Sequence, residues 1–236
     1  MNAVISATRL HLNQRRGTFL VPLWIAAVVG IVSVIIALIF WRGGSQPGTV
    51  EWIQNSRSNP GIIYALGGFL VYFGVASVAS TYPFALTLGS TRRAFVAGTL
   101  LWQAFVAAYV AVVFLVLTLI EIATDHWFIG FYVFDIYALG AGDPWRLLAI
   151  VFLGVLAFLT IGAVFAASWV RFGTRGPQLL ALALIVALGL GVAILAPELA
   201  AIVAAFQLWW LAVAAAVVIV LASTGTWALL RSAVIR

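Results

Sequence analysis

Six apolar runs without a charged side chain or a histidine constrain the fold of this chain more than any other feature. They cover residues 18–41, 61–82, 94–120, 147–170, 178–196 and 206–230. A helix needs about 20 apolar residues to cross the hydrocarbon core of a bilayer. Barrel strands would be about half as long, and an open sheet in lipid would leave backbone groups unpaired. The runs therefore predict an all-α integral membrane protein with six transmembrane helices.

The composition agrees with a protein that is solvated by lipid. Of the 236 residues, 65% are hydrophobic and 8% are charged, whereas soluble domains carry about 25% charged residues. The chain leaves no room for a second soluble domain of ordinary size, so we expect residues 1–236 to form a single transmembrane domain. The first apolar run is too long for the core of a cleavable signal peptide. Cysteine is absent, which excludes disulfides and thiolate sites.

The charged side chains sort to opposite ends of the predicted spans. If six spans follow a cytoplasmic N-terminus, nine of the twelve arginines lie inside, three lie outside, and all six acids lie outside. Cytoplasmic segments of membrane proteins carry the excess of basic residues, so we predict that both termini are cytoplasmic. The inner set is Arg9, Arg15, Arg16, Arg92, Arg93, Arg171, Arg175, Arg231 and Arg236, the outer set is Arg42, Arg57 and Arg146, and the acids are Glu51, Glu121, Asp125, Asp135, Asp143 and Glu198.

Residues 1–17 precede the first span and are moderately amphipathic. Val4, Ile5, Thr8 and Leu12 fall near one face of a helix. We expect an N-terminal helix that lies on the inner membrane surface, with basic side chains at Arg9, Arg15 and Arg16. The alternative is a short basic tail that only orients the first span.

The motifs of nucleotide and hydrolytic chemistry are missing. The chain has no lysine and so no Walker A loop, and it has no HExxH or GxSxG sequence. The predicted topology places His11 and His126 on opposite sides of the membrane, and Glu121, Asp125 and His126 in one loop are weak evidence for a metal site. We expect no catalytic, cofactor or metal site in this chain. The spans also lack the buried acids and bases of ion-coupled carriers, so energy for transport should come from outside the chain.

The outer segment 121–145 is too interrupted to span a membrane but is rich in aromatic residues. We expect it to dip into the outer interface or to pack across the ends of the spans, where it could form part of a substrate exit. A belt of interfacial aromatic side chains without a ligand role is the simpler interpretation. Small residues in the spans permit close helix contact within the chain, or else form a subunit interface or translocation surface. They are Gly67, Gly68, Gly74, Gly154, Gly162, Gly189 and Gly191.

The predicted cytoplasmic loop between the second and third spans carries the strongest functional signal. Tyr82-Pro83 is expected to end the second span, and residues 86–89 can form a short turn or helix. Ser90 or Thr91 can then cap the third span, with Arg92 and Arg93 at the level of the lipid headgroups. A loop that is merely anchored by its two arginines is the plainer interpretation.

The string PFALTLGSTRRAFVAGT in this loop resembles the permease subunits of ATP-binding-cassette type-2 exporters, particularly small actinobacterial members. The likeness covers roughly residues 59–103, and beyond it only the layout of spans agrees. It implies a multi-pass subunit in a bacterial plasma membrane, with a coupling helix between spans two and three. One departure is that this chain elaborates the outer segment between spans three and four, whereas many members elaborate the region between spans five and six.

The resemblance further implies a division of labour. ATP and magnesium would be held by a separate ATPase subunit, and a second permease chain, identical or a paralogue, would complete the path for the cargo. Lipids surround the spans, and no nucleic-acid partner is expected, because the basic residues do not cluster on a polar domain. The ATPase would dock on the N-terminal segment and on Phe84, Leu86, Leu88, Gly89, Ser90, Thr91, Arg92 and Arg93.

Two other functions remain open at the level of sequence. A membrane scaffold or assembly factor would hold a stable partner without rearranging when nucleotide binds. A lipid-modifying membrane enzyme would need outer acids such as Asp125, Asp135 and Asp143 acting with a metal ion.

Overall fold

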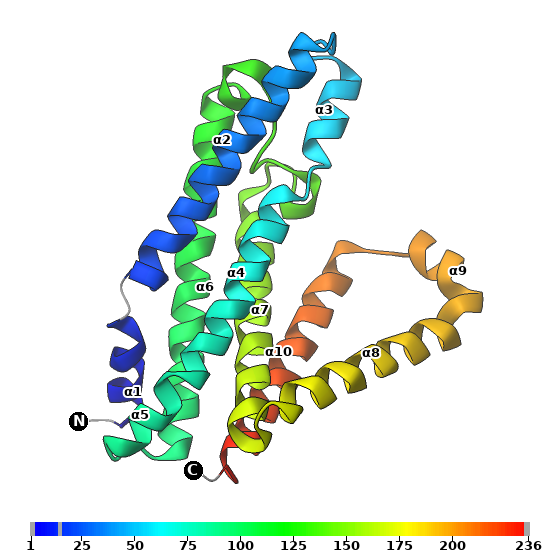
Figure 1. Cartoon of the computed structure of the whole chain (residues 1–236). Coiled ribbons are helices and arrows are strands. Elements are labelled where there is room, and N and C mark those ends of the chain that lie inside the picture. The colour runs from blue at the N-terminus through cyan, green and yellow to red at the C-terminus, as the bar shows by residue number, and fades with distance from the viewer. Residues whose placement is uncertain (1–2, 14–15, 234–236) are drawn as a thin grey trace. The chain divides into compact units, whose positions relative to one another are not determined.

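The computed structural model describes residues 3–13 and 16–233 (Figure 1). Of the described residues 84% are helical, and none of them lies in a strand. Six stretches are long and apolar enough to cross a membrane, which indicates a multi-pass membrane protein and confirms the predicted number of spans. They are Arg16–Arg42, Val50–Thr87, Arg92–Ala123, Pro144–Phe172, Arg175–Ile202 and Trp209–Leu230.

The helices follow one another with short connections, as expected for spans that cross a bilayer in turn. In chain order they are α1 (Ala3–Leu12), η1 (Arg16–Leu20), α2 (Val21–Arg42), α3 (Val50–Arg57), α4 (Gly61–Ala79), α5 (Thr81–Thr87), α6 (Arg92–Ala123), η2 (His126–Gly130), η3 (Tyr137–Leu139), α7 (Pro144–Phe172), α8 (Arg175–Leu195), η4 (Ala196–Glu198), α9 (Leu199–Ala204) and α10 (Leu208–Leu230).

The observed spans differ from the predicted bounds by a few residues at most ends, and three of the differences have a local structural cause or consequence. The second span breaks at Ser80, between α4 and α5, and Pro83 lies in the first turn of α5, where its missing N–H group costs no helical hydrogen bond. A five-residue turn of helix, η1, precedes α2. The last span begins at Leu208 rather than at residue 206, because Gln207 has an extended backbone.

The described residues group into two compact units, and the prediction of a single domain over 1–236 stays a prediction. Unit 1 draws on Met1–His11, Val71–Leu101 and Ala157–Arg236, and unit 2 on Leu12–Leu70 and Trp102–Leu156. Helices α4, α6 and α7 therefore contribute to both units.

The core of unit 1 forms where α5 meets parts of α4, α6, α7 and the end of α10. Its members are buried apolar side chains, with the two aromatic rings of Tyr82 and Phe95 in edge-to-face contact at 5.2 Å between centroids. The cluster comprises Val78, Tyr82, Ala85, Phe95, Val96, Ala163, Ala166, Ala167, Leu230 and Ala233. Elements far apart in the sequence are thus held together around α5.

Two glycines bring α4 and α7 into backbone contact within unit 1. A Cβ atom on Gly74 would lie 2.3 Å from the carbonyl oxygen of Leu159, and one on Gly162 would lie 2.2 Å from that of Val71. These two glycines therefore serve packing within the chain. Around Gly154, by contrast, an added Cβ would meet nothing within 4 Å.

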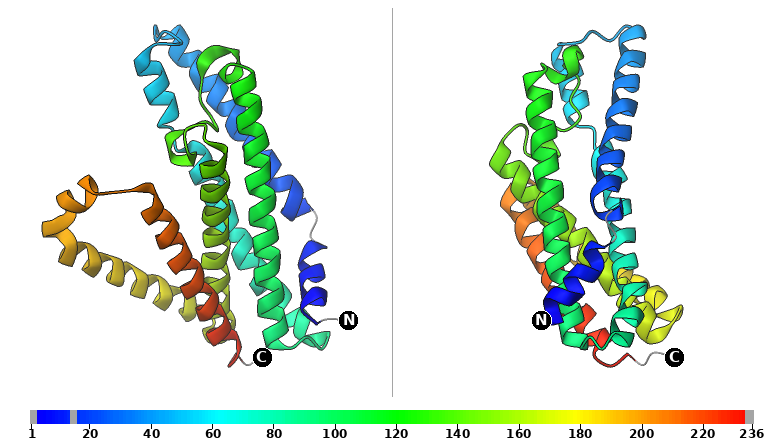
Figure 2. Two further views of the ribbon diagram at one scale, coloured as in Figure 1. Left: turned by 180° about the vertical axis from the view of Figure 1, so that it is seen from behind. Right: turned by 90° about the vertical axis from the view of Figure 1, so that its left-hand side faces the viewer.

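Helix α8 is apolar and almost entirely exposed. Gly176 is its one buried residue, and a Cβ there would collide with the carbonyl oxygen of Ser168 on α7. Beyond this point α8 diverges from α10, and η4 and α9 join the two (Figures 1 and 2). An exposed apolar helix of this kind is suited to lipid or to another membrane-embedded chain.

Unit 2 holds η1, α2 and α3 with the later part of α6 and the outer segment. The phenol of Tyr109 on α6 donates a hydrogen bond to the carbonyl oxygen of Phe19, 3.0 Å away. The Phe19 ring packs edge-to-face on Phe105 and Tyr109. These contacts place η1 beside α6, and Figure 2 shows α2 continuing alongside it.

Candidate functional site

Helix α5 has one buried face and one exposed face. Thr81, Tyr82 and Ala85 are buried in the unit 1 core, and the Tyr82 phenol donates a hydrogen bond to the carbonyl oxygen of Leu230 at 3.0 Å. Phe84 and Leu88 are 53% and 64% exposed. They lie four positions apart and so share a side of the helix. The exposed pair Phe84 and Leu88 is called the α5 surface below.

The turn after α5 is a tightly specified helix end. Gly89 has a φ of +79°, a conformation that glycine adopts without strain. Its N–H group donates to the carbonyl oxygen of Leu86, and the Ser90 N–H donates to that of Ala85. This pair of bonds is the Schellman arrangement, which satisfies carbonyls that a helix end would otherwise leave open. The predicted turn over 86–89 is therefore present, but the helix before it begins at Thr81.

Thr91, and not Ser90, caps the third span. The Thr91 hydroxyl accepts a hydrogen bond from the Ala94 N–H at 3.2 Å. Such a bond satisfies one of the four free N–H groups at the start of a helix.

The two loop arginines have different surroundings. Arg92 donates a hydrogen bond to the carbonyl oxygen of Arg231, so it ties the start of α6 to the end of α10. Arg93 is exposed and lines a shallow groove with side chains of α6 and α10, including Trp227. Within the described part of the chain no ion pair joins Arg93 to an acid, so its charge is open to a partner.

The N-terminal helix α1 packs on α6. A Cβ on Gly98 would come within 2.6 Å of the Ala7 Cβ, and the Thr8 hydroxyl donates to the carbonyl oxygen of Gly98 at 3.2 Å. The packed face therefore centres on Ala7 and His11, whereas Ile5, which belongs to the predicted amphipathic face, is 44% exposed. Close approach at a glycine decides the face here, and the apolar pattern alone does not show it.

His11 is buried in this contact. Its Nε2 atom lies 3.0 Å from the Thr99 hydroxyl oxygen, and its ring lies 5.7 Å from that of Phe95. The Thr99 hydroxyl already donates to the Phe95 carbonyl oxygen, so the imidazole Nε2–H group is the donor to Thr99. Burial lowers the pKa of His11 from 6.5 to about 4.

The three basic residues expected in the N-terminal segment stay a prediction as a site. Arg9 is exposed on α1, and Arg16 is exposed at the start of η1. Arg15 lies outside the described residues. That α1 lies on the membrane surface stays a prediction.

At the outer segment, Glu121 anchors the chain to the end of α6. Its carboxylate is fully buried and accepts hydrogen bonds from the backbone N–H groups of Val133, Phe134 and Asp135, at 2.9, 2.7 and 3.3 Å. The Phe134 ring also packs edge-to-face on Phe114 of α6. A buried carboxylate is stable only with such donors, so the segment is fixed to α6.

A polar cluster lies beside this anchor. Arg57 of α3 donates to the Asp135 carboxylate at 2.6 Å, and the His126 Nε2 atom lies 3.2 Å from the same oxygen. The Arg57 guanidinium also lies 4.6 Å from the centre of the Tyr132 ring, and burial raises the pKa of that phenol. The cluster ties α3 to the outer segment. The segment therefore packs on helices α3 and α6, which agrees with one of the two arrangements expected for it.

The structure does not assemble the weak metal candidate. The Glu121 oxygens are occupied by backbone N–H groups, while His126 faces Asp135. Asp125 is exposed, and its carboxylate lies 3.8 Å from the His126 Nδ1 atom. Within residues 3–13 and 16–233, no three potential ligands are grouped in a way that would hold a metal ion.

A strained turn leads into this segment. Asp125, His126, Trp127 and Phe128 all have positive φ angles between 50° and 63°. Left-handed backbone costs roughly 1–2 kcal/mol for each residue that carries a Cβ. The hydrogen bonds of Glu121 and the ion pair of Asp135 can offset the energy that this backbone conformation costs. No sequence motif predicts the turn.

Comparisons with known proteins give no relative for this chain. No protein-family model, no curated protein and no solved structure matches it.

Proposed function

We propose that this chain is the membrane-spanning permease subunit of an ATP-driven exporter of the ATP-binding-cassette type-2 kind. A separate ATPase subunit docks on the α5 surface from the cytoplasm and supplies the energy. The observation that carries the proposal is the two-sided character of α5. Phe84 and Leu88 are offered to a partner, while Tyr82 on the opposite side is buried against α6 and α10.

This arrangement can convert docking into movement of the spans. A force on the exposed face of α5 would pass through Tyr82 to Leu230 and through the Phe95 ring to α6. Because packed interfaces switch between discrete arrangements, such a link transmits a shift instead of absorbing it. Arg92 adds a second tie to the end of α10 through the Arg231 carbonyl oxygen.

The proposal includes the sidedness of the chain. The N-terminal helix, the α5 loop and the end of α10 all belong to unit 1, through the contacts of Thr8 with Gly98 and of Tyr82 with Leu230. The distribution of arginines favours the cytoplasm for this end. A second permease chain, identical or a paralogue, pairs with this one in the membrane of a bacterial cell.

Single cysteines test the sidedness directly, because the natural chain has none. Leu88→Cys should react with a membrane-impermeant maleimide only after the cells are opened. Phe128→Cys, which is 84% exposed on the outer segment, should react in intact cells. Labelling of Leu88→Cys from outside would overturn the proposal.

Co-purification tests the docking. The chain is isolated in mild detergent, the ATPase that accompanies it is identified, and retention is compared between the wild type and Phe84→Ser/Leu88→Ser. Exposed apolar anchors at the centre of an interface are each worth roughly 2 kcal/mol, so we expect retention to fall more than tenfold. The control is Phe128→Ser, which should leave it unchanged. Equal retention in the double variant, or ATP hydrolysis by the chain alone, would contradict the proposal.

A further inference from the structure

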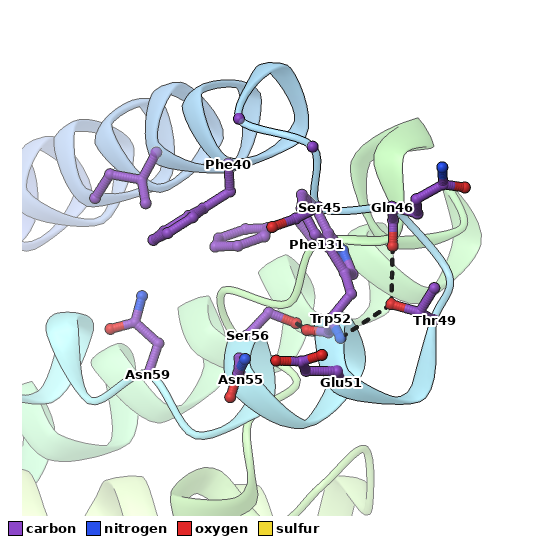
Figure 3. Close-up of a pocket in the computed structure, with 13 residues that line it drawn as sticks. Phe40, Ser45, Gln46, Thr49, Glu51, Trp52, Asn55, Ser56, Asn59 and Phe131 are labelled. Carbon is purple, nitrogen blue, oxygen red and sulfur yellow. Dashed lines mark hydrogen bonds between the residues drawn. The ribbon is translucent and has the colours of Figure 1, made fainter.

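A cavity of about 800 Å³ lies in unit 2, away from the α5 surface. It is bounded by the C-terminal end of α2, the turn that follows, helix α3 and Phe131 of the outer segment (Figure 3). Its size is within the range of about 300–1,000 Å³ that is typical of small-molecule sites. None of the interactions described for the α5 loop involves the residues that line it.

One side of the cavity is an aromatic wall that is already fixed in place. Trp52 of α3 and Phe131 are almost fully buried, and their rings meet edge-to-face at 5.9 Å. The Trp52 indole N–H donates to the carbonyl oxygen of Gly130 at 2.7 Å. Phe40 points from α2 toward this wall in Figure 3. A wall that is rigid before a ligand arrives loses little entropy when it binds one.

Polar side chains also line the cavity, and they come from α3 and the residues that follow it. Glu51 and Asn55 lie one helical turn apart and line the cavity, and Asn59 follows them (Figure 3). The hydroxyls of Thr49 and Ser56 are occupied, because they donate to the carbonyl oxygens of Gln46 and Trp52. Glu51 is the one charged residue among those that line the cavity, and among the described residues no ion pair engages its carboxylate. The cavity therefore has a net negative charge.

The cavity is also bordered by a membrane-spanning helix, α2. Ile36 and Phe40, which line the cavity from the last turns of α2, are 37% and 57% exposed. Helix α2 is a membrane span, so the exposed sides of these residues face the acyl chains of lipids. A molecule in the cavity would thus have its polar part at α3 and its apolar part beside α2.

From these features we propose that the cavity binds an amphiphilic cation that carries a quaternary ammonium group. The ammonium lies near Glu51 and against the small exposed parts of the Trp52 and Phe131 rings that line the cavity, and the hydrocarbon tail lies along Ile36 and Phe40. Aromatic walls with a nearby carboxylate favour such cations, because the ring quadrupole attracts a charge that cannot donate hydrogen bonds. Taking the bound molecule as exported cargo rests on the proposed function, whereas binding itself does not.

Photolabelling of the full-length chain, without any ATPase, tests the binding. The protein is placed in nanodiscs of phosphatidylethanolamine, and the probe is dodecyltrimethylammonium with a diazirine in its tail. We expect saturable labelling of residues 36–59 and weak labelling by the uncharged dodecanol analogue. Glu51→Gln should weaken the apparent affinity about fivefold, because the nearby carboxylate is lost. Glu198→Gln, an exposed acid in η4, is the matched control and should label like the wild type.

Three results would overturn the site: labelling that does not saturate, equal labelling by the uncharged analogue, or an unchanged affinity in Glu51→Gln. A competition experiment then identifies the natural source of the cation, and either of its outcomes is consistent with the site. Adding phosphatidylcholine to the nanodiscs either displaces the probe, which assigns the lipid headgroup, or leaves it bound, which assigns a single-chain amphiphile. Because no ATPase is present, failure here is distinct from failure of docking at the α5 surface.

Discussion

Tyr82 and Leu230, separated by 148 positions in the chain, are joined by a hydrogen bond of 3.0 Å from the phenol to the main-chain carbonyl oxygen. Tyr82 is fully buried, and Leu230 belongs to the same apolar cluster. The bond fixes the loop helix α5 to the last turn of α10. It is the most direct physical link between the proposed docking surface and a span.

Tyr82→Phe removes this bond and keeps the ring. We expect the free energy of unfolding in detergent to fall by about 1 kcal/mol, since the carbonyl of Leu230 loses its phenol donor. The measurement is thermal or denaturant unfolding of the purified chain. Tyr72→Phe is the matched control, because the Tyr72 side chain is 67% exposed on α4. Equal stability of the two variants would mean that the bond does not hold α5.

Gly162→Ala should disturb the contact of α7 with α4. Its new Cβ atom would lie 2.2 Å from the Val71 carbonyl oxygen, and neither backbone can yield without moving a helix. A loss of about 1–3 kcal/mol is expected from such overpacking. Gly154→Ala on the same helix meets nothing within 4 Å and should be neutral or slightly stabilising. Unfolding curves of both variants in the same detergent check this, and a neutral Gly162→Ala would contradict the contact.

Asp135→Asn should cost more than Asp143→Asn. The Asp135 side chain is 3% exposed and faces both Arg57 and His126, whereas the Asp143–Arg146 pair is largely exposed. Removing one partner of a buried pair costs roughly 3–5 kcal/mol, while an exposed pair is worth about 0–1 kcal/mol. Asparagine at 143 can still cap α7 through its side-chain oxygen, as Asp143 does for Trp145 and Arg146. Unfolding free energies of the two variants provide the comparison.

Acid should release α1 from α6. His11 has a pKa of about 4 when docked and 6.5 as its ordinary value, so the undocked segment binds a proton that the docked one excludes. The docking free energy is therefore fully present above about pH 6.5 and weakens as the pH falls toward 4, by about 3 kcal/mol in all.

Hydrogen exchange of residues 3–12 measures this release, after correction for the intrinsic exchange rate at each pH. Protection should decline between pH 6.5 and 4 in the wild type. His11→Gln, which can donate to Thr99 but does not titrate, should show no such decline. A decline of equal size in His11→Gln would assign the effect to another group.

The spans were predictable because each depends on its own stretch of apolar sequence. The cap of α7 is a local feature of the same kind, because Asp143 stands directly before the first residues of the helix and accepts the Trp145 and Arg146 N–H bonds. Thr91, one of two expected caps, was confirmed for the same reason.

The contacts that shape the candidate site could not be predicted, because they join residues far apart in the chain. Arg57 and Asp135 are separated by 78 positions, and nothing local to either indicates the other. Tyr82-Pro83 predicted the end of a helix, yet a proline in a first turn is compatible with a new helix that starts at Thr81. The packing of α1 likewise depends on Gly98 of another helix, and nothing in residues 1–17 indicates that contact.

The backbones of α4 and α7 meet directly at Gly74 and Gly162, where neither residue has a side chain to separate them. The loop helix α5 begins at Thr81, seven positions after Gly74 of α4. In the proposed docking, a displacement of α5 would therefore reach α4 close to the place where its backbone contacts α7.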